Sequence, residues 1–193
     1  SIIVTSGTGS GKTECFMVPI LDELARLNEA QGGPIEGVRA LFLYPLNALI
    51  QSQQERLHAW TGPFAGDIRF CLYNGQTPEK PEPRHIASRT PNQVKDRQTL
   101  RASPPPILVT NATMLEYMLV RSQDSSILQK SSGKLQWIVL DEAHHLEDAA
   151  TSAGSTRVSL LAIRRAAAPL LRHRDRAGAL ERAVDGRAPA QTH

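Results

Sequence analysis

Short apolar runs alternate along this chain with longer stretches in which apolar and polar residues mix. Four runs have the length of a β-strand and are almost uniformly apolar, as parallel strands covered on both sides usually are. They lie at residues 38–44, 68–73, 106–110 and 135–141. Two stretches that follow strands directly, residues 46–60 and 111–121, have the length of helices. This alternation predicts an α/β fold with a mostly parallel central sheet and helices on both faces.

The segment at residues 77–106 interrupts the alternation. It is rich in Pro and polar residues, which predicts a long polar insertion with one short helix around residues 92–101. We favour a solvated surface over a dedicated nucleic-acid contact for its basic side chains. These side chains are Lys80, Arg84, Arg89, Lys95, Arg97 and Arg101.

A glycine-rich loop follows a further apolar run, Ile2–Val4, near the start of the sequence. The loop reads "TSGTGSGKTE" over residues 5–14 and leads into a stretch with apolar residues at helical spacing. Strand, glycine-rich loop and helix form the context in which Gly-Lys-Thr binds phosphate, through inward-facing N–H groups and the helix N-terminus. The residues expected to hold the phosphates of ATP are Gly7, Thr8, Gly9, Ser10, Gly11, Lys12 and Thr13.

Two side chains of this loop have further roles. The Lys12 ammonium group can reach the β- and γ-phosphates and take part in catalysis, and the Thr13 hydroxyl can be a ligand of Mg²⁺. Ser6 stands where the usual pattern begins with Gly, and its small side chain is compatible with the turn. The competing interpretation is a flexible turn with a surface lysine, which the flanking strand and helix disfavour.

A second half of the ATP site is predicted at the end of the last apolar run. Asp141 and Glu142 directly follow Trp137–Leu140, so both carboxylates should emerge at the carboxyl edge of the sheet. Open α/β sheets bind ligands at this edge, where the phosphate loop also lies. Asp141 is suited to hold Mg²⁺, and Glu142 is suited to orient the attacking water and accept its proton. The combination indicates ATP hydrolysis.

Five motifs, in the correct order, resemble those of superfamily 2 helicases of the DEAD/DEAH-box group. "GTGSGKT" resembles motif I, and "DEAH" resembles motif II. "YPLNAL" followed by Gln53, "YNGQT", and "ILVTNATML" with Ala112 at a position where Pro is usual, resemble the intervening motifs, most closely those of Lhr-like DNA helicases. The resemblance extends from residue 1 to about residue 148.

The resemblance implies the first RecA-like lobe of an ATP- and Mg²⁺-dependent helicase. His144 would couple the nucleotide site to the nucleic acid, with DNA favoured over RNA. Asn47 replaces a frequently basic residue, so its contact would be an uncharged hydrogen bond. Asn111 can also cap the helix that follows it, and the two roles are compatible. The residues implied to contact the nucleic-acid backbone are Pro45, Asn47, Gly75, Thr110 and Asn111.

Composition adds limits to this picture. The net charge is +3 and the pI is about 9.1, but the basic excess lies in residues 151–193, so the pI alone says little about nucleic acid. Cys15 and Cys71, which we expect to be buried, cannot form a four-cysteine cluster and fit a reducing cytoplasm. No apolar run is long enough for a membrane helix. We expect one lobe over residues 1–168 and a partly disordered Ala/Arg-rich tail over residues 169–193.

The expected activity depends on a partner lobe. In the family that the chain resembles, a second RecA-like lobe supplies the arginine that stabilises the transferred phosphoryl group. We find no motif of that lobe in the sequence and therefore expect little or no turnover by this fragment alone. Two alternatives stay open, namely a P-loop ATPase of another type and a nucleotide- or nucleic-acid-binding remnant without turnover.

Substitution of Lys12 tests the phosphate-loop assignment. Lys12→Ala removes the cation aimed at the phosphates, so binding of a fluorescent ATP analogue should be abolished or strongly weakened. Lys80→Ala removes a cation from the polar insertion and should leave this binding unchanged. Equal binding by the Lys12→Ala variant and the unmodified chain would contradict the assignment.

Overall fold

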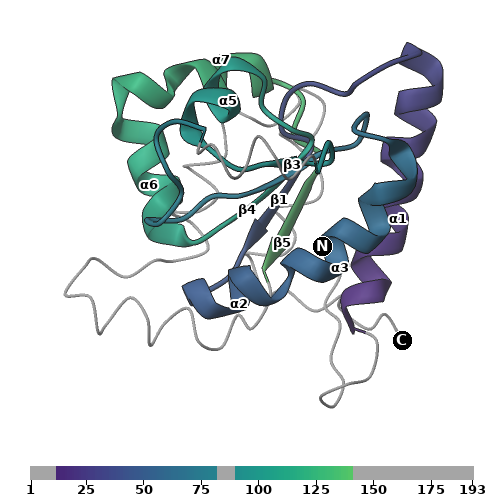
Figure 1. The fold of residues 1–193 in the computed structure, drawn as a ribbon, viewed down its shortest axis with the longest axis horizontal. Helices are drawn as coiled ribbons and strands as arrows, with labels where there is room; N and C mark the ends of the chain where they lie inside the picture. The colour runs from purple at the N-terminus through teal and green to yellow at the C-terminus, as the bar shows by residue number, and fades with distance from the viewer. Residues whose placement is uncertain (1–11, 82–89, 141–193) are drawn as a thin grey trace, which may run out of the picture.

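A parallel sheet organises the part of the chain that the computed structural model describes, residues 12–81 and 90–140. Within these residues the sheet has five strands in the spatial order β3-β2-β4-β1-β5, and every pair is parallel (Figure 1). The strands are β1 (Ala40–Leu43), β2 (Phe70–Leu72), β3 (Gln93–Val94), β4 (Ile107–Thr110) and β5 (Trp137–Leu140). The predicted α/β fold is confirmed, while the predicted strand at Ile2–Val4 lies outside the described residues.

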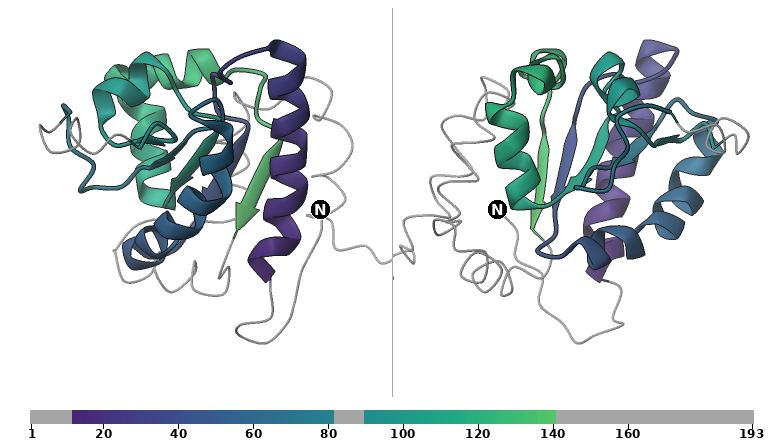
Figure 2. Two further views of the ribbon diagram at one scale, coloured as in Figure 1. Left: turned by 45° about the vertical axis from the view of Figure 1, so that its right-hand side comes forward. Right: turned by 60° about the vertical axis from the view of Figure 1, so that its left-hand side comes forward.

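Helices cover both faces of the sheet (Figure 2). One face packs against α1 (Lys12–Gln31), α2 (Asn47–Ser52) and α3 (Gln54–Thr61), which leads into the short 3₁₀ helix η1 (Gly62–Phe64). The other face packs against α5 (Arg97–Ala102), α6 (Ala112–Val120) and α7 (Ser125–Ser131), with the 3₁₀ helix η2 (Ser122–Asp124) between the last two. The predicted helix at residues 46–60 is thus two helices that meet at Gln53.

Alternation of side chains along the strands builds a separate hydrophobic core on each face. In β1, Ala40 and Phe42 contact the cluster that includes α1, whereas Leu41 and Leu43 contact the cluster that includes α6. Successive side chains of a strand point to opposite faces, so an apolar strand can serve both cores. All four residues of β1 are buried, which explains the uniformly apolar run.

The segment at residues 77–106 is part of this fold, in contrast to the solvated insertion expected from its composition. Gln93 and Val94 form β3, which pairs with Phe70 and Cys71 of β2 at the end of the described sheet. The predicted short helix exists as α5, and its Leu100 is fully buried in the core. The Pro and polar residues therefore belong to loops within this segment, and the segment is not a separate insertion on the surface.

Two further expectations have different outcomes. Cys71 is buried as expected, but Cys15 is exposed on α1, so its predicted burial is wrong. None of the helices in the described residues is long and apolar enough to span a bilayer. The Ala/Arg-rich tail predicted at residues 169–193 lies outside the described part of the chain.

Gly37 gives a test of the packing between the end of α7 and the strand β1. Its φ is +93°, and an added Cβ would lie 2.5 Å from the carbonyl oxygen of Lys130. Gly32 also has a positive φ, of +67°, but nothing lies within 4 Å of its added Cβ.

Gly32→Ala should therefore cost only the left-handed backbone penalty of about 1–2 kcal/mol. Gly37→Ala should lower the free energy of unfolding by clearly more, because the Lys130 carbonyl must also move. Urea denaturation of both variants measures the difference. A similar loss in the two variants would mean that the close approach at Gly37 is not as described.

Candidate functional site

The predicted nucleotide residues lie at the edge of the described structure. Helix α1 begins on the side of the sheet to which the strands point (Figure 1), and Thr13 lies half-buried in its first turn. Lys12 is the first residue of α1. The remaining predicted nucleotide-site residues lie outside the described part of the chain, and so does the predicted coupling residue. They are Gly7, Thr8, Gly9, Ser10, Gly11, Asp141, Glu142 and His144.

Parallel register brings the ends of three strands level at this edge. Leu43 of β1 is paired with Thr110 of β4 and with Leu140 of β5. The residues after β1 and β4, which the sequence associates with nucleic acid, therefore start from neighbouring positions. Strand β5 ends at this edge with Leu140, and Asp141, which follows it in the sequence, lies outside the described residues.

Asn47 and Asn111 form the most direct link between the predicted nucleic-acid motifs. Asn111 donates from Nδ2 to Oδ1 of Asn47 over 2.9 Å, at an exposed position, although the two residues are 64 apart in sequence. Asn111 also caps α6, because its Oδ1 accepts the N–H of Met114 at 2.8 Å. Within the described residues, no group accepts a hydrogen bond from Nδ2 of Asn47. Asn47 is exposed, so the pair forms a polar amide group at the surface of the described structure, and the predicted cap is present.

Thr110 lies beneath this surface. It is fully buried at the end of β4, and its hydroxyl donates to the carbonyl oxygen of Tyr73 at 2.7 Å. The Thr110 side chain therefore ties the end of β4 to the end of β2. Pro45 is half-buried where the chain turns from β1 into α2, two residues before Asn47.

Gly75 lies in a tight turn that follows β2. The Asn74 side chain accepts the N–H of Gln76 at 2.9 Å. The Thr77 hydroxyl accepts the N–H of Asn74 and donates to the carbonyl oxygen of Leu72, each over 3.0 Å. Gly75 itself is exposed, and an added Cβ would meet nothing within 4 Å. The buried side chains of Asn74 and Thr77 thus fix the turn, and the backbone of Gly75 remains accessible.

Arg97 fixes this turn, a role that the sequence did not indicate. Its Nε donates to the carbonyl oxygen of Thr77 at 2.9 Å, and its Nη2 donates to that of Asn74 at 3.3 Å. The guanidinium group also lies over the ring of Tyr73, 5.3 Å from the centroid. Arg97 was expected to face solvent with the other basic residues of its segment, and that expectation is wrong because α5 brings it against the turn.

A buried carboxylate supports the same region from the other side. Asp124 is fully buried and accepts the hydroxyl of Tyr73 at 3.1 Å and Nε of Arg101 at 2.7 Å. Burial, and then the Asp124 carboxylate, raises the pKa of Tyr73, so its hydroxyl remains a proton donor. Arg101 makes a second ion pair with Glu79, so it also does not face solvent as expected. This network joins η2, α5 and the end of β2.

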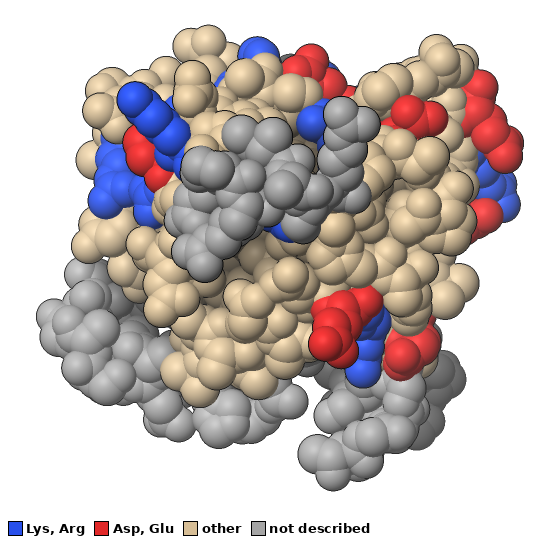
Figure 3. Space-filling model, viewed as in Figure 1, with Lys and Arg blue, Asp and Glu red and all other residues tan. Residues whose placement is uncertain are grey.

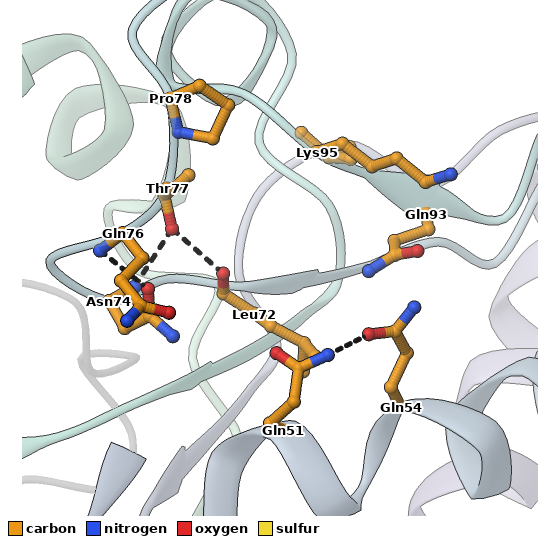
Figure 4. Close-up of a pocket in the computed structure, with 10 residues that line it drawn as sticks. Gln51, Gln54, Leu72, Asn74, Gln76, Thr77, Pro78, Gln93 and Lys95 are labelled. Atoms are coloured by element: carbon orange, nitrogen blue, oxygen red, sulfur yellow. Dashed lines mark hydrogen bonds between the residues drawn. The ribbon is translucent and has the colours of Figure 1, made fainter. Parts of the chain in front are cut away.

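A polar hollow of about 240 Å³ opens beside the turn (Figure 4). Residues of α2 and α3 form one wall, and the turn after β2 and the strand β3 form the other. The described residues that line it are Gln51, Gln54, Leu72, Asn74, Gln76, Thr77, Pro78, Gln93, Val94 and Lys95. Sequence reasoning gave a role to none of these four glutamines, although Gln76 lies within "YNGQT", because they come from four separate elements and form no local pattern.

The surface above α2 is uncharged. Helix α2 reads "NALIQS" and contains no ionisable side chain, and the corresponding area in Figure 3 is free of the Lys, Arg, Asp and Glu colours. A ligand that contacts this part of the edge would therefore meet amide groups and backbone more than charges.

Comparison with known proteins places these motifs in a family. The family model described as DEAD/DEAH box helicase matches residues 1–169. The chain is 35% identical over 89 residues to the Druantia protein DruE of Escherichia coli (strain UMEA 4076-1). This aligned stretch covers 40% of this chain and 5% of that protein. It is 30% identical over 164 residues to the ATP-dependent rRNA helicase SPB4 of Cryptococcus neoformans var. neoformans. This aligned stretch covers 75% of this chain and 21% of that protein.

A third relative is the ATP-dependent helicase Lhr-Core of Methanothermobacter thermautotrophicus. The identity is 28% over 158 residues, which covers 77% of this chain and 16% of that protein. The chain therefore spans about a fifth or less of the length of these three relatives. The identity to Lhr-Core does not exceed that to the rRNA helicase.

Removal of the Arg97 guanidinium group should loosen the turn that carries Gly75. Arg97→Ala deletes two charge-assisted hydrogen bonds, so the free energy of unfolding should fall by about 1–3 kcal/mol. The amides of Gln76 and Thr77 should exchange their hydrogens faster. Hydrogen exchange measures this local effect.

Arg121→Ala is the matched control. Arg121 also lies over an aromatic ring, that of Tyr117, at 4.6 Å from the centroid, but it makes no described contact with the turn. Its removal should leave exchange at Gln76 and Thr77 unchanged. Equal exchange at the turn in the two variants would contradict the role given to Arg97.

Proposed function

We propose that this chain, which belongs to the DEAD/DEAH box helicase family, acts as an ATP-dependent motor lobe that contacts one nucleic-acid strand along the carboxyl edge of its sheet. The observation that carries the proposal is the hydrogen bond between Asn111 and Asn47. It joins two motifs from separate parts of the sequence in one exposed polar site, at the edge where α1 begins.

The nucleotide half of the proposed function rests on the loop and on the acidic segment after β5. Residues 7–13 would surround the phosphates, with Lys12 as the catalytic cation. Thr13 and Asp141 would hold Mg²⁺, which neutralises phosphate charge when bound. Glu142 would orient the water and accept its proton. The start of the 20-residue helix α1 at the carboxyl edge supports this arrangement, because a helix N-terminus favours anions.

The nucleic-acid half rests on backbone and amide groups. Asn47 would donate from Nδ2 to a phosphate oxygen, and the exposed Gly75 N–H would serve a second phosphate. Asn111 would act mainly by holding Asn47 and capping α6. Thr110 would act from below the surface by fixing the strand ends, and Pro45 by directing α2. His144 would transmit changes at the nucleotide site to this edge.

The finer assignment to DNA rests on the resemblance of the Pro45–Asn47 and Thr110–Asn111 motifs to Lhr-like DNA helicases. One relative is named an rRNA helicase, so RNA oligonucleotides belong in every binding assay of this chain. A motor lobe of this type uses an arginine from a second RecA-like lobe to stabilise the transferred phosphoryl group. We therefore propose that the 193 residues alone hydrolyse ATP close to background, with or without DNA.

Opposite charges placed on the Asn pair test the proposed strand path. Asn111→Asp keeps an oxygen that caps α6, so the stability should be nearly unchanged. It also places a negative charge beside the phosphates, and affinity for unrelated oligonucleotides should fall about tenfold or more at low salt. Asn47→Lys should strengthen binding. It should also steepen the slope of log affinity plotted against log salt concentration by about 0.7, because each added phosphate contact to a single strand contributes that amount.

Gln129→Glu and Gln129→Lys are the matched controls. Gln129 is an exposed residue of α7, and Figure 1 shows α7 at the end of the sheet opposite the carboxyl edge. The same changes of charge there should leave affinity and salt dependence nearly unaltered. Equal effects at Asn111, Asn47 and Gln129 would show that only net charge matters and would overturn the proposed path.

A further inference from the structure

The polar hollow beside the turn adjoins the proposed path of the nucleic-acid strand. Gln51, in its wall, follows Asn47 by one helical turn of α2, so both side chains lie on the same side of that helix. Gln76, also in its wall, follows Gly75 directly. The hollow therefore opens next to both groups that would contact phosphates.

Amide groups dominate the lining of the hollow. Gln51 and Gln54 point from α2 and α3 toward the turn and β3, where Gln93 faces them (Figure 4). Gln51 and Gln54 hydrogen-bond to each other. Gln93 is oriented by His58, whose Nε2 lies 2.9 Å from Gln93 Oε1, so the Gln93 amino group is directed away from His58. Each of these amides combines donor and acceptor groups.

The charge and size of the hollow select the chemical class of its occupant. None of the described lining residues is acidic, and Lys95 adds a cation. Leu72, Val94 and Pro78 contribute apolar surface. The volume of about 240 Å³ is below the roughly 300–1,000 Å³ of sites for drug-sized ligands. A single planar ring system with several donors and acceptors, linked to phosphate, fits these properties.

We propose that the hollow receives one base of the bound nucleic-acid strand, turned out of line where the backbone crosses Asn47 and Gly75. The proposal rests on the proposed function and adds a base contact to the backbone contacts. The described lining contains no aromatic ring, so hydrogen bonds from the amides hold the base and stacking does not. Because every amide of the lining carries both donor and acceptor groups, each of the four bases can find partners there, so the site requires a base but discriminates little among bases.

An abasic-site scan of the full chain tests the proposal. The shortest thymine oligonucleotide that binds with full affinity is used, so that the register is fixed, and a single abasic nucleotide is moved along it while fluorescence anisotropy measures the affinity at each position. At one position the loss of the base should weaken binding about fivefold or more, the scale of one or more net hydrogen bonds. At the other positions the loss should have little effect. Replacement of thymine by adenine at the sensitive position should change the affinity less than twofold.

Three variants locate the effect. Gln51→Ala and Gln76→Ala remove exposed amides from the wall of the hollow, and each should reduce the penalty of the abasic site at the sensitive position. Gln98→Ala is the matched control, because Gln98 is an exposed glutamine of α5 that does not line the hollow. It should keep the full penalty. Urea denaturation of the three variants confirms that each remains folded.

The outcomes separate this inference from the proposed function. Oligonucleotide binding with equal affinity at every abasic position would overturn the base site and leave the proposed backbone contacts in place. Absence of binding to any DNA or RNA oligonucleotide would overturn both. Competition by free thymidine monophosphate that Gln51→Ala and Gln76→Ala both abolish, with no sensitive position in the scan, would show that a soluble nucleotide occupies the hollow and would overturn the strand-bound base.

Discussion

Strand β1 is hydrogen-bonded to a parallel strand on each side, with Leu43 level with Thr110 of β4 and with Leu140 of β5. This register sets where the chain leaves the sheet, and the proposed chemistry depends on those exit points. A shift of one residue in β4 would turn its apolar side chains to the other face and separate Asn111 from Asn47. The two hydrophobic cores oppose such a shift, because each accepts only alternate residues of the strands.

The turn after β2 depends on a second set of contacts, which comes from the segment that looked least structured in the sequence. Arg97 holds the carbonyl groups of the turn, and Arg101 reaches the buried Asp124, which also accepts the hydroxyl of Tyr73. A buried carboxylate without these partners would be costly, so the network requires all its members. The exposed Gly75 is thus supported by side chains that no ligand needs to touch.

The proposed nucleic-acid half follows one physical logic. The groups proposed to meet the strand, Asn47 and Gly75, are exposed and short, whereas Thr110 is buried beneath them and Asn111 is fixed as the cap of α6. Because buried contacts already hold these groups in place, less conformational entropy is lost when a nucleic-acid strand binds. The amide-lined hollow continues this surface along α2, since Gln51 follows Asn47 by one helical turn.

The sequence by itself determined the alternation of apolar strands and helices, and hence the α/β class, because uniformly apolar runs such as "ALFL" and "ILVT" need cover on both faces. It also indicated the loop, the acidic segment and Asn111 as a cap, since those motifs are local and contiguous. Only the tertiary structure decided that residues 93–94 form a strand of the sheet, that Arg97 and Arg101 turn inward, and that Asn47 meets Asn111. The same holds for the hollow, whose glutamines come from α2, α3, the turn and β3. Contacts between residues far apart in sequence depend on strand order, and no local pattern carries that information.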